Sequence, residues 1–463
     1  MGRKRNKIAL IATVTTLWPT FASPQQGGIG ANTGGLQIDF GIANSLKADS
    51  NFALAPGNPG RSIIADSKLT FGLSSIQQNS QLTIGASGVL RWADIPGRSI
   101  KGFEDQIVNF RYQTDSYNSR LVLDGRYRNV DREFLDPFAV EKEALIFPTL
   151  TSNGGNLRET NLGVSYDTGL AAPLGLSISL RHFSQDYSNV VSPSLFDTET
   201  NYAKIGARLN LSPITTARLS VAQTDYSASD LVSTDRRTRE YAVGLTHELD
   251  QTLTLDTMVG ITDVDTFGIP GASSSGLVGS VGLTKALPDG QIYGTVASSR
   301  NQNGLRTTLT FGRDIVRATS SLKASLGVTE GQSSNSSVIG SLTYDKQLAN
   351  GNFTATLDRS SSTNGLNQDI LDTRIGLGYG YALTSTSLVD LRFNWGQSQG
   401  EGSSLGIPTI ETANVTASYS RAINNGWSMT GGVTLRKRSE TGVGNADSSA
   451  LFLTLDRNFS FRP

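Results

Sequence analysis

The chain has no cysteine, which excludes disulfides, thiolate catalysis, cysteine zinc sites and a lipid anchor on cysteine. Only two of its 463 residues are histidine. It has no hydrophobic run long enough for a membrane-spanning helix, and its mean hydropathy is slightly negative. Basic and acidic residues number 40 each, which gives no case for nucleic-acid binding. Stability must therefore come from backbone pairing and burial.

The end of the chain shows a strict alternation of apolar and polar residues. It reads A-L-F-L-T-L-D-R-N-F-S-F-R-P, in which Leu451, Leu453, Leu455, Phe459 and Phe461 share one parity. Side chains on a β-strand alternate between two faces, so one face of this strand is apolar and the other is polar. Lipid-facing and lumen-facing residues alternate in this way in a membrane β-barrel.

This segment resembles the closing strand of Gram-negative outer-membrane β-barrel proteins, a porin-like class. Their assembly signal is a terminal aromatic residue preceded by apolar residues at alternate positions. The resemblance implies that Phe459 and Phe461 form the assembly signal, which the barrel-assembly machinery reads. Arg457 interrupts the apolar face, and Arg462 and Pro463 follow the last aromatic residue. Taken alone, the strand also fits the edge of a soluble β-sandwich.

The start of the chain predicts export. Four basic residues lie among the first seven, residues 8–18 are apolar but too short to span a bilayer, and Ala22 ends a small-x-small cleavage site. We therefore expect a signal peptide at residues 1–22, a flexible segment at 23–35 and a barrel at 36–463.

The middle of the chain repeats apolar-alternating stretches of about nine to eleven residues, the length that a tilted strand needs to cross a bilayer. Short turns, several with Asn-Gly or Asp-Gly, join them alternately with longer polar loops such as residues 262–276, 329–337 and 396–408. The pattern predicts an all-β fold, a single antiparallel up-and-down transmembrane β-barrel of about 22 strands, the first at 36–43. An even count places both termini and the short turns in the periplasm and the long loops outside.

Each strand assigns its residues to two faces. Ile205 and Leu391 should face lipid, whereas their neighbours Lys204 and Arg392 should face the lumen. The predicted lumen-facing residues are Arg111, Arg120, Asp124, Arg126, Arg128, Lys204, Arg208, Arg306, Asp390, Arg392 and Arg436.

The longest connection, residues 129–157, is apolar and acidic rather than rich in Gly and Ser. Its aromatic residues must be shielded from water by other parts of the protein, and residues 139–145 can form a short helical turn. Folding into the barrel mouth would place its acids opposite the arginines at 111, 120, 126 and 128, similar to the constriction loop of general porins. A surface flap or a subunit contact is the alternative. The candidate acids are Asp131, Glu133, Asp136, Glu141 and Glu143.

Residues for catalysis are scarce. His182 and His247 fall on the lipid-facing parity, and the sequence has no G-x-S-x-G motif and no histidine cluster. Asp263 and Asp265 form a D-x-D pair without the remaining calcium ligands, which is typical of a solvated loop. We expect no enzyme activity, no cofactor and no bound metal.

Two functional classes remain. A barrel of this size has a lumen too wide for its own side chains to fill, which favours a channel for passive passage of solutes. The alternative is a structural or export-associated barrel that serves polysaccharide or protein secretion or surface interaction. Residues 23–35 are too short for a plug, which argues against a TonB-dependent receptor. The expected partners are outer-membrane lipid and lipopolysaccharide.

Overall fold

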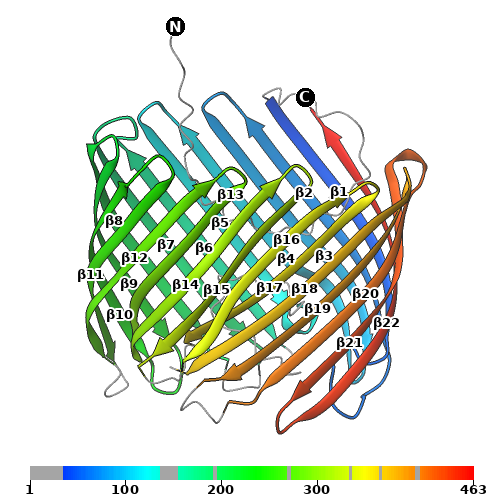
Figure 1. Ribbon diagram of the computed structural model, residues 1–463. Coiled ribbons are helices and arrows are strands. Elements are labelled where there is room, and N and C mark those ends of the chain that lie inside the picture. The colour runs from blue at the N-terminus through cyan, green and yellow to red at the C-terminus, as the bar shows by residue number, and fades with distance from the viewer. Residues whose placement is uncertain are drawn as a thin grey trace. The chain divides into compact units, whose positions relative to one another are not determined.

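A computed structural model describes residues 35–135, 155–190, 195–267, 273–332, 336–363, 368–401 and 407–462. The compact unit Gly34–Pro463 contains a single sheet of 22 strands (Figure 1). Within the described ranges, no helix is long and apolar enough to cross a bilayer. The predicted signal peptide lies outside these ranges, so it stays a prediction.

The strands of the first half are β1 Gly35–Asp49, β2 Ser62–Ile76, β3 Ser80–Ile95, β4 Arg98–Asp115, β5 Ser119–Asp131, β6 Asn156–Thr168, β7 Leu174–Ser188, β8 Thr198–Ser212, β9 Thr215–Ala228, β10 Asp235–Glu248 and β11 Leu253–Phe267. Those of the second half are β12 Ser274–Leu287, β13 Gly290–Asn301, β14 Gly304–Arg317, β15 Ser320–Gly331, β16 Ser337–Leu348, β17 Gly351–Thr363, β18 Asp369–Thr384, β19 Ser387–Gly400, β20 Ile410–Ala422, β21 Trp427–Glu440 and β22 Gly444–Phe461. Two single 3-10 turns, η1 Arg132–Phe134 and η2 Asn424–Gly426, lie between strands.

The sheet closes on itself. Each strand pairs antiparallel with its neighbours in sequence, and β1 pairs with β22, where Phe40 lies opposite Phe459. Closure leaves no unpaired edge strand. The predicted fold, an antiparallel up-and-down barrel of about 22 strands, is confirmed.

One row of the ladder shows which face is outside. Ile205 is the partner of Ile178 on β7 and of Val221 on β9, and the row continues through Tyr241 to Ile261. All five are exposed, Ile205 to 62%. Exposed apolar side chains in register across five strands form the lipid-facing surface of a barrel, so the alternate residues point inward.

The connections divide the barrel into two ends. The short-turn end, at the top of Figure 1, holds tight connections such as 213–214, 288–289 and 349–350, as well as the start of β1 and the end of β22. The other end, the long-loop end, holds the connections 50–61 and 132–155.

Every second connection was expected to be long, but three at the long-loop end are tight. They are residues 96–97, 302–303 and 441–443. In the first, Gly97 has a φ of +80°, a conformation that glycine adopts without strain. Tight reverse turns therefore occur at both ends of the barrel.

The strands contain 12 to 18 residues, more than the nine to eleven expected. Residues 262–267, expected in a loop, form the end of β11, and residues 396–400 form the end of β19. Backbone groups gain from pairing beyond the bilayer as well as within it, so the ladders continue into polar segments that the apolar alternation does not mark.

Candidate functional site

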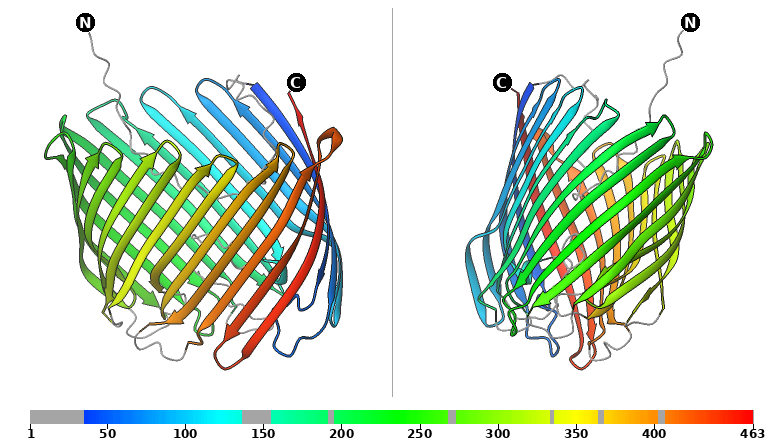
Figure 2. Two further views of the ribbon diagram at one scale, coloured as in Figure 1. Left: turned by 45° about the vertical axis from the view of Figure 1, so that its right-hand side comes forward. Right: turned by 90° about the vertical axis from the view of Figure 1, so that its left-hand side faces the viewer.

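An apolar cluster lies inside the barrel at the long-loop end. Ile64 on β2 and Ala93 and Ile95 on β3 are buried, and Phe52 from the β1–β2 connection packs on them. Phe134 of η1 completes this mouth cluster, its ring centroid 4.7 Å from that of Phe52. Figure 2 shows this end at the bottom of both views. Two connections therefore fold inward over the wall of β2 and β3.

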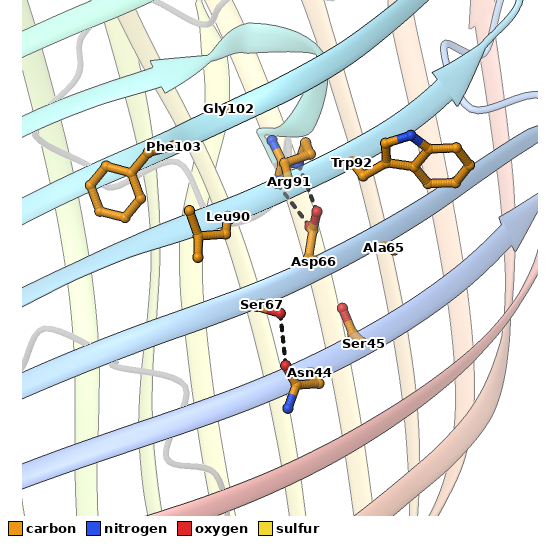
Figure 3. A pocket seen from close by; sticks show the side chains of 10 residues that line it. All are labelled: Asn44, Ser45, Ala65, Asp66, Ser67, Leu90, Arg91, Trp92, Gly102 and Phe103. Atoms are coloured by element: carbon orange, nitrogen blue, oxygen red, sulfur yellow. Dashed lines mark hydrogen bonds and ion pairs between the residues drawn. The ribbon is translucent and has the colours of Figure 1, made fainter.

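Arg91 anchors the mouth cluster. Its guanidinium donates to both carboxylate oxygens of Asp66 at 2.9 and 3.0 Å (Figure 3) and to Asp105 at 2.8 Å. The ring of Phe134 stacks on the guanidinium, with the centroid 3.5 Å from Cζ. A charge this deeply buried needs ion pairs and hydrogen bonds, and Arg91 has both.

The first two acids of the long connection bind a different arginine from those expected. Asp131 and Glu133 each accept from Nη2 of Arg98 at 2.9 Å, and Asp131 also caps η1 by accepting from the backbone N–H of Glu133. Burial raises the pKa of Glu133, partly offset by Arg98. Arg98 is the partner because η1 follows β5 directly and therefore lies beside the start of β4, which begins at Arg98. Asp136, Glu141, Glu143 and the expected helical turn at 139–145 lie outside the described residues.

Arg436 sits at the seam where the barrel closes. Its Nη2 donates to Asp49 at 2.7 Å and to the backbone oxygen of Phe52 at 3.0 Å. Lys47 also contacts Asp49, at 3.0 Å, and the Asp49 side chain is fully buried. Arg436 therefore joins β21 to β1 and to the mouth cluster.

Arg306 has a similar role on another part of the wall. Its guanidinium lies 3.0 Å from Asp369 and 3.8 Å from Glu401, and it donates to the hydroxyl of Ser361. The side chains of Arg306, Asp369 and Glu401 are nearly buried. Arg306 thereby connects β14 to β17, β18 and the residue after β19.

The register places all eleven predicted lumen residues on the parity opposite to the exposed hydrophobic residues. Several have partners within the wall: Arg120 with Asp115 at 2.5 Å, Arg128 with Glu159, Arg392 with Asp390 at 2.7 Å, and Arg208 with the backbone oxygen of Gly169 at 2.8 Å. Among the described residues, Lys204, Arg111 and Asp124 have no ion-pair partner within 4 Å. Of these eleven residues, Lys204 and Arg111 are therefore cations without an ion-pair partner among the described residues, and Arg111 lies opposite Asp124 in the register.

The acidic residues near the loops do not gather around a metal. Asp263 and Asp265 each lie 3.8 Å from Arg239, and Asp225 pairs with Arg237 at 2.7 Å. In the described segments, no group of three metal-ligating side chains could hold an ion.

A shallow hollow lies over β1 to β4 (Figure 3). Leu90, Trp92 and Phe103 line it together with Ser67, whose hydroxyl donates to Oδ1 of Asn44 at 2.7 Å. The exposed apolar side chains show that this is the lipid-facing side of the wall. It therefore lies on the opposite face of the wall from the mouth cluster, although Arg91 is among the residues that line it.

The closing strand shows why Arg457 is tolerated on an apolar face. Its guanidinium lies 4.4 Å from the ring centroid of Phe459 and 5.7 Å from that of Trp427. Phe459 and Phe461 are exposed beside it at the short-turn end. Arginine stacked among aromatic rings suits a membrane interface, where its charge reaches the headgroups.

The residues that sequence reasoning missed are Phe52, Asp66, Arg91, Arg98 and Asp105. Each is unremarkable in its own strand or loop, and its partner lies on another strand. These residues come together only through the strand register. The sequence could have predicted one pair, because Asp66 and Arg91 have opposite charges and both lie on the inward parity of adjacent strands.

No protein-family model matches the chain, and no curated protein sequence matches it. Solved structures do match. The ferric enterobactin receptor of Pseudomonas aeruginosa, solved with enterobactin, is similar with a TM-score of 0.56 and 9% identity, over 94% of this chain and 82% of that one. The siderophore receptor PirA of Acinetobacter baumannii matches with a TM-score of 0.55 and 9% identity, over 92% and 81%. The FrpB iron transporter of Neisseria meningitidis matches with a TM-score of 0.54 and 9% identity, over 91% and 82%.

These matches show the fold, and the resemblance to outer-membrane barrels is confirmed. They also correct the expected function. The similar structures are siderophore receptors and an iron transporter, so the interpretation as a passive porin is wrong, and the alternative of an export or structural barrel finds no support. The argument against a receptor rested on the short N-terminal segment, which says nothing about the barrel itself.

Proposed function

We propose that this chain is an outer-membrane transport barrel of the receptor type, which binds its solute inside the barrel before uptake. The strand number carries the proposal. Known passive porins have 16 to 18 strands and an aqueous channel, whereas 22-stranded barrels are transporters whose lumen is not left open. This chain forms a closed barrel of 22 strands that aligns over 94% of its length with a ferric enterobactin receptor.

The proposal includes an orientation, with the short-turn end in the periplasm and the long-loop end outside. Outer-membrane barrels have short periplasmic turns and longer external loops. Aromatic side chains support a bilayer between the two ends, because Trp427 and Phe459 lie at the short-turn end and Trp92 at the other.

The solute class that fits best is an anionic iron chelate, because the similar structures include a ferric enterobactin receptor and a siderophore receptor and the interior holds an unpaired cation. Several of the predicted inward-facing arginines are held in ion pairs, whereas Lys204 is an inward-facing cation without an ion-pair partner among the described residues. A negatively charged solute would find unneutralised positive charge at this side chain.

The test is a binding titration on the refolded full-length protein in detergent micelles, with ferric enterobactin as probe and tryptophan fluorescence as readout. We expect saturable quenching. Lys204→Gln should weaken binding about 3- to 10-fold, or roughly 1 kcal/mol. Lys346→Gln is the matched control, because Lys346 lies on the outward parity of β16. Non-saturable quenching that is equal in both variants would reject the proposal.

A further inference from the structure

A line of polar contacts runs across the outward face of β7 and β8. Nδ1 of His182 lies 2.8 Å from Oδ1 of Asn201, and Nδ2 of Asn201 donates to Oε1 of Glu199 at 2.7 Å. Because the amide nitrogen of Asn201 faces Glu199, its oxygen must accept from the imidazole, so Nδ1 of His182 carries the hydrogen. Nδ1 also lies 3.7 Å from Oε1 of Glu199. The other ring nitrogen, Nε2, has no partner among the described residues.

Ser184 lies beside this imidazole. It follows His182 by two residues on the same strand, so both side chains share the outward face with Cβ atoms about 6.6 Å apart. No hydrogen bond joins Ser184 to His182 in the described structure, and a change of the Ser184 rotamer would bring its hydroxyl toward the imidazole. In the part of the chain that the structure describes, the Ser184 hydroxyl makes no hydrogen bond. A serine next to a histidine whose ring is held by a third group is the arrangement that activates a nucleophile.

The position of this group along the barrel indicates what it would meet. Leu174, Leu176 and Leu180 are exposed on the outward face of β7 and precede His182. The apolar band of a barrel is about 25 Å tall, which a strand tilted by about 45° crosses in roughly eleven residues. Counted from Leu174, the band ends near Ser184. That level of a bilayer holds the ester bonds of its lipids, between the acyl chains and the headgroups.

The neighbouring strand adds two groups to the same face. Thr160 on β6 is the register partner of Ser184, and Arg158 is the partner of Asp186. Directly opposed side chains have Cβ atoms about 5 Å apart, so the Thr160 hydroxyl is placed to donate to a carbonyl oxygen attacked by Ser184. Arg158, two residues closer to the long-loop end, can bind a phosphate.

We infer that Ser184 and His182 are catalytic residues of a serine hydrolase site on the outer wall, with Asn201 as a positioning residue, and that the substrate is an ester of a membrane phospholipid. Ser184 Oγ bonds to the ester carbon while its proton passes to His182 Nε2. The bond to the alcohol breaks, and the alcohol leaves with that proton. Water then attacks the acyl-serine, gives a proton to Nε2 and releases the fatty acid as Ser184 regains its proton. The net reaction consumes one ester and one water and yields one acid and one alcohol.

The experiment measures fatty-acid release by the refolded full-length protein from mixed micelles that contain a phosphatidylethanolamine with a fluorescent acyl chain. Ser184→Ala and His182→Gln should each lower release at least 100-fold. Asn201→Ala should lower kcat about 10-fold or more with little change in KM, because the imidazole loses its fixed tautomer while the lipid surface is unchanged. Ser179→Ala is the matched control, since Ser179 lies on the inward face of the same strand. It should match the wild type.

A second readout does not depend on turnover. An alkyl fluorophosphonate should label Ser184 covalently, as peptide mass spectrometry would show, and His182→Gln should abolish labelling in a barrel that still shows normal heat-modifiable mobility. Release that persists in Ser184→Ala, or the absence of both labelling and release in the folded wild type, would overturn the inference. Either result leaves the proposed uptake function untouched, because that function depends on the interior and the mouth.

Discussion

Replacing Arg91 with alanine should destabilise the barrel more than removal of any exposed charge on its wall. The Arg91 side chain is 4% exposed and holds two carboxylates, those of Asp66 and Asp105, at 2.8 to 3.0 Å. Without the guanidinium, both carboxylates remain largely buried without a counter-ion. Breaking a buried pair in this way costs about 3–5 kcal/mol. Phe134 would also lose the cation on which it stacks.

Two further variants test that reasoning. Arg392 is 56% exposed and pairs with Asp390, so Arg392→Ala should change the free energy of unfolding by less than about 1 kcal/mol. Changing Arg91→Met, Asp66→Asn and Asp105→Asn together should recover most of the lost stability, because no buried charge remains. Asn also tolerates the positive φ of +52° at position 105.

The assay is equilibrium unfolding by guanidinium of protein refolded into lipid vesicles, followed by tryptophan fluorescence. The expected order of stability is wild type close to Arg392→Ala, then the triple variant, then Arg91→Ala. An Arg91→Ala barrel within 1 kcal/mol of the wild type would refute the view that this ion-pair group holds the mouth cluster.

Three other predictions follow from the register, the closing strand and the mouth. In this cysteine-free chain, a cysteine at Ile205 should react with a membrane-dissolved thiol reagent and one at Lys204 with a small water-soluble reagent; labelling without that parity would contradict the assigned faces. Phe461→Ala should lower the amount of heat-modifiable barrel in the outer membrane and increase periplasmic proteolysis, whereas normal levels would place the assembly signal elsewhere. Because burial raises the pKa of Glu133, the docked η1 segment should gain stability as pH falls through that pKa and lose it as pH rises. Hydrogen exchange of the Phe134 amide should therefore slow toward acid pH once corrected for intrinsic rates, and Glu133→Gln should remove the dependence.

The fold was predictable because one physical rule governs every strand. A residue that faces lipid must be apolar, whereas its neighbour on the strand need not be. The sequence alone therefore predicts that Ile205 faces lipid and Lys204 faces the lumen. The strand ends were less predictable. Beyond the bilayer both faces of the sheet contact water, so apolar and polar residues no longer alternate. Backbone pairing alone then extends a strand such as β11 through Asp263 to Phe267.

The candidate site was predictable only in part, because its contacts join distant segments. Arg436 and Asp49 are 387 residues apart and meet only after the barrel closes. Arg98 was not expected to bind Asp131 because the turn direction of η1 is a local backbone property that charge patterns do not encode. In the same way, the sequence identifies His182 as lipid-facing, but only the register places Asn201 opposite it.

The measurement that tests the central claim most directly is the flux of neutral sugars of increasing size into vesicles that contain the refolded full-length protein. A receptor-type barrel predicts that ferric enterobactin, bound inside the barrel, lowers these rates at least several-fold and that Lys204→Gln weakens this effect. Rates that fall steeply as the sugars become larger and are unchanged by added ferric enterobactin would contradict the account and indicate passive diffusion through an open barrel.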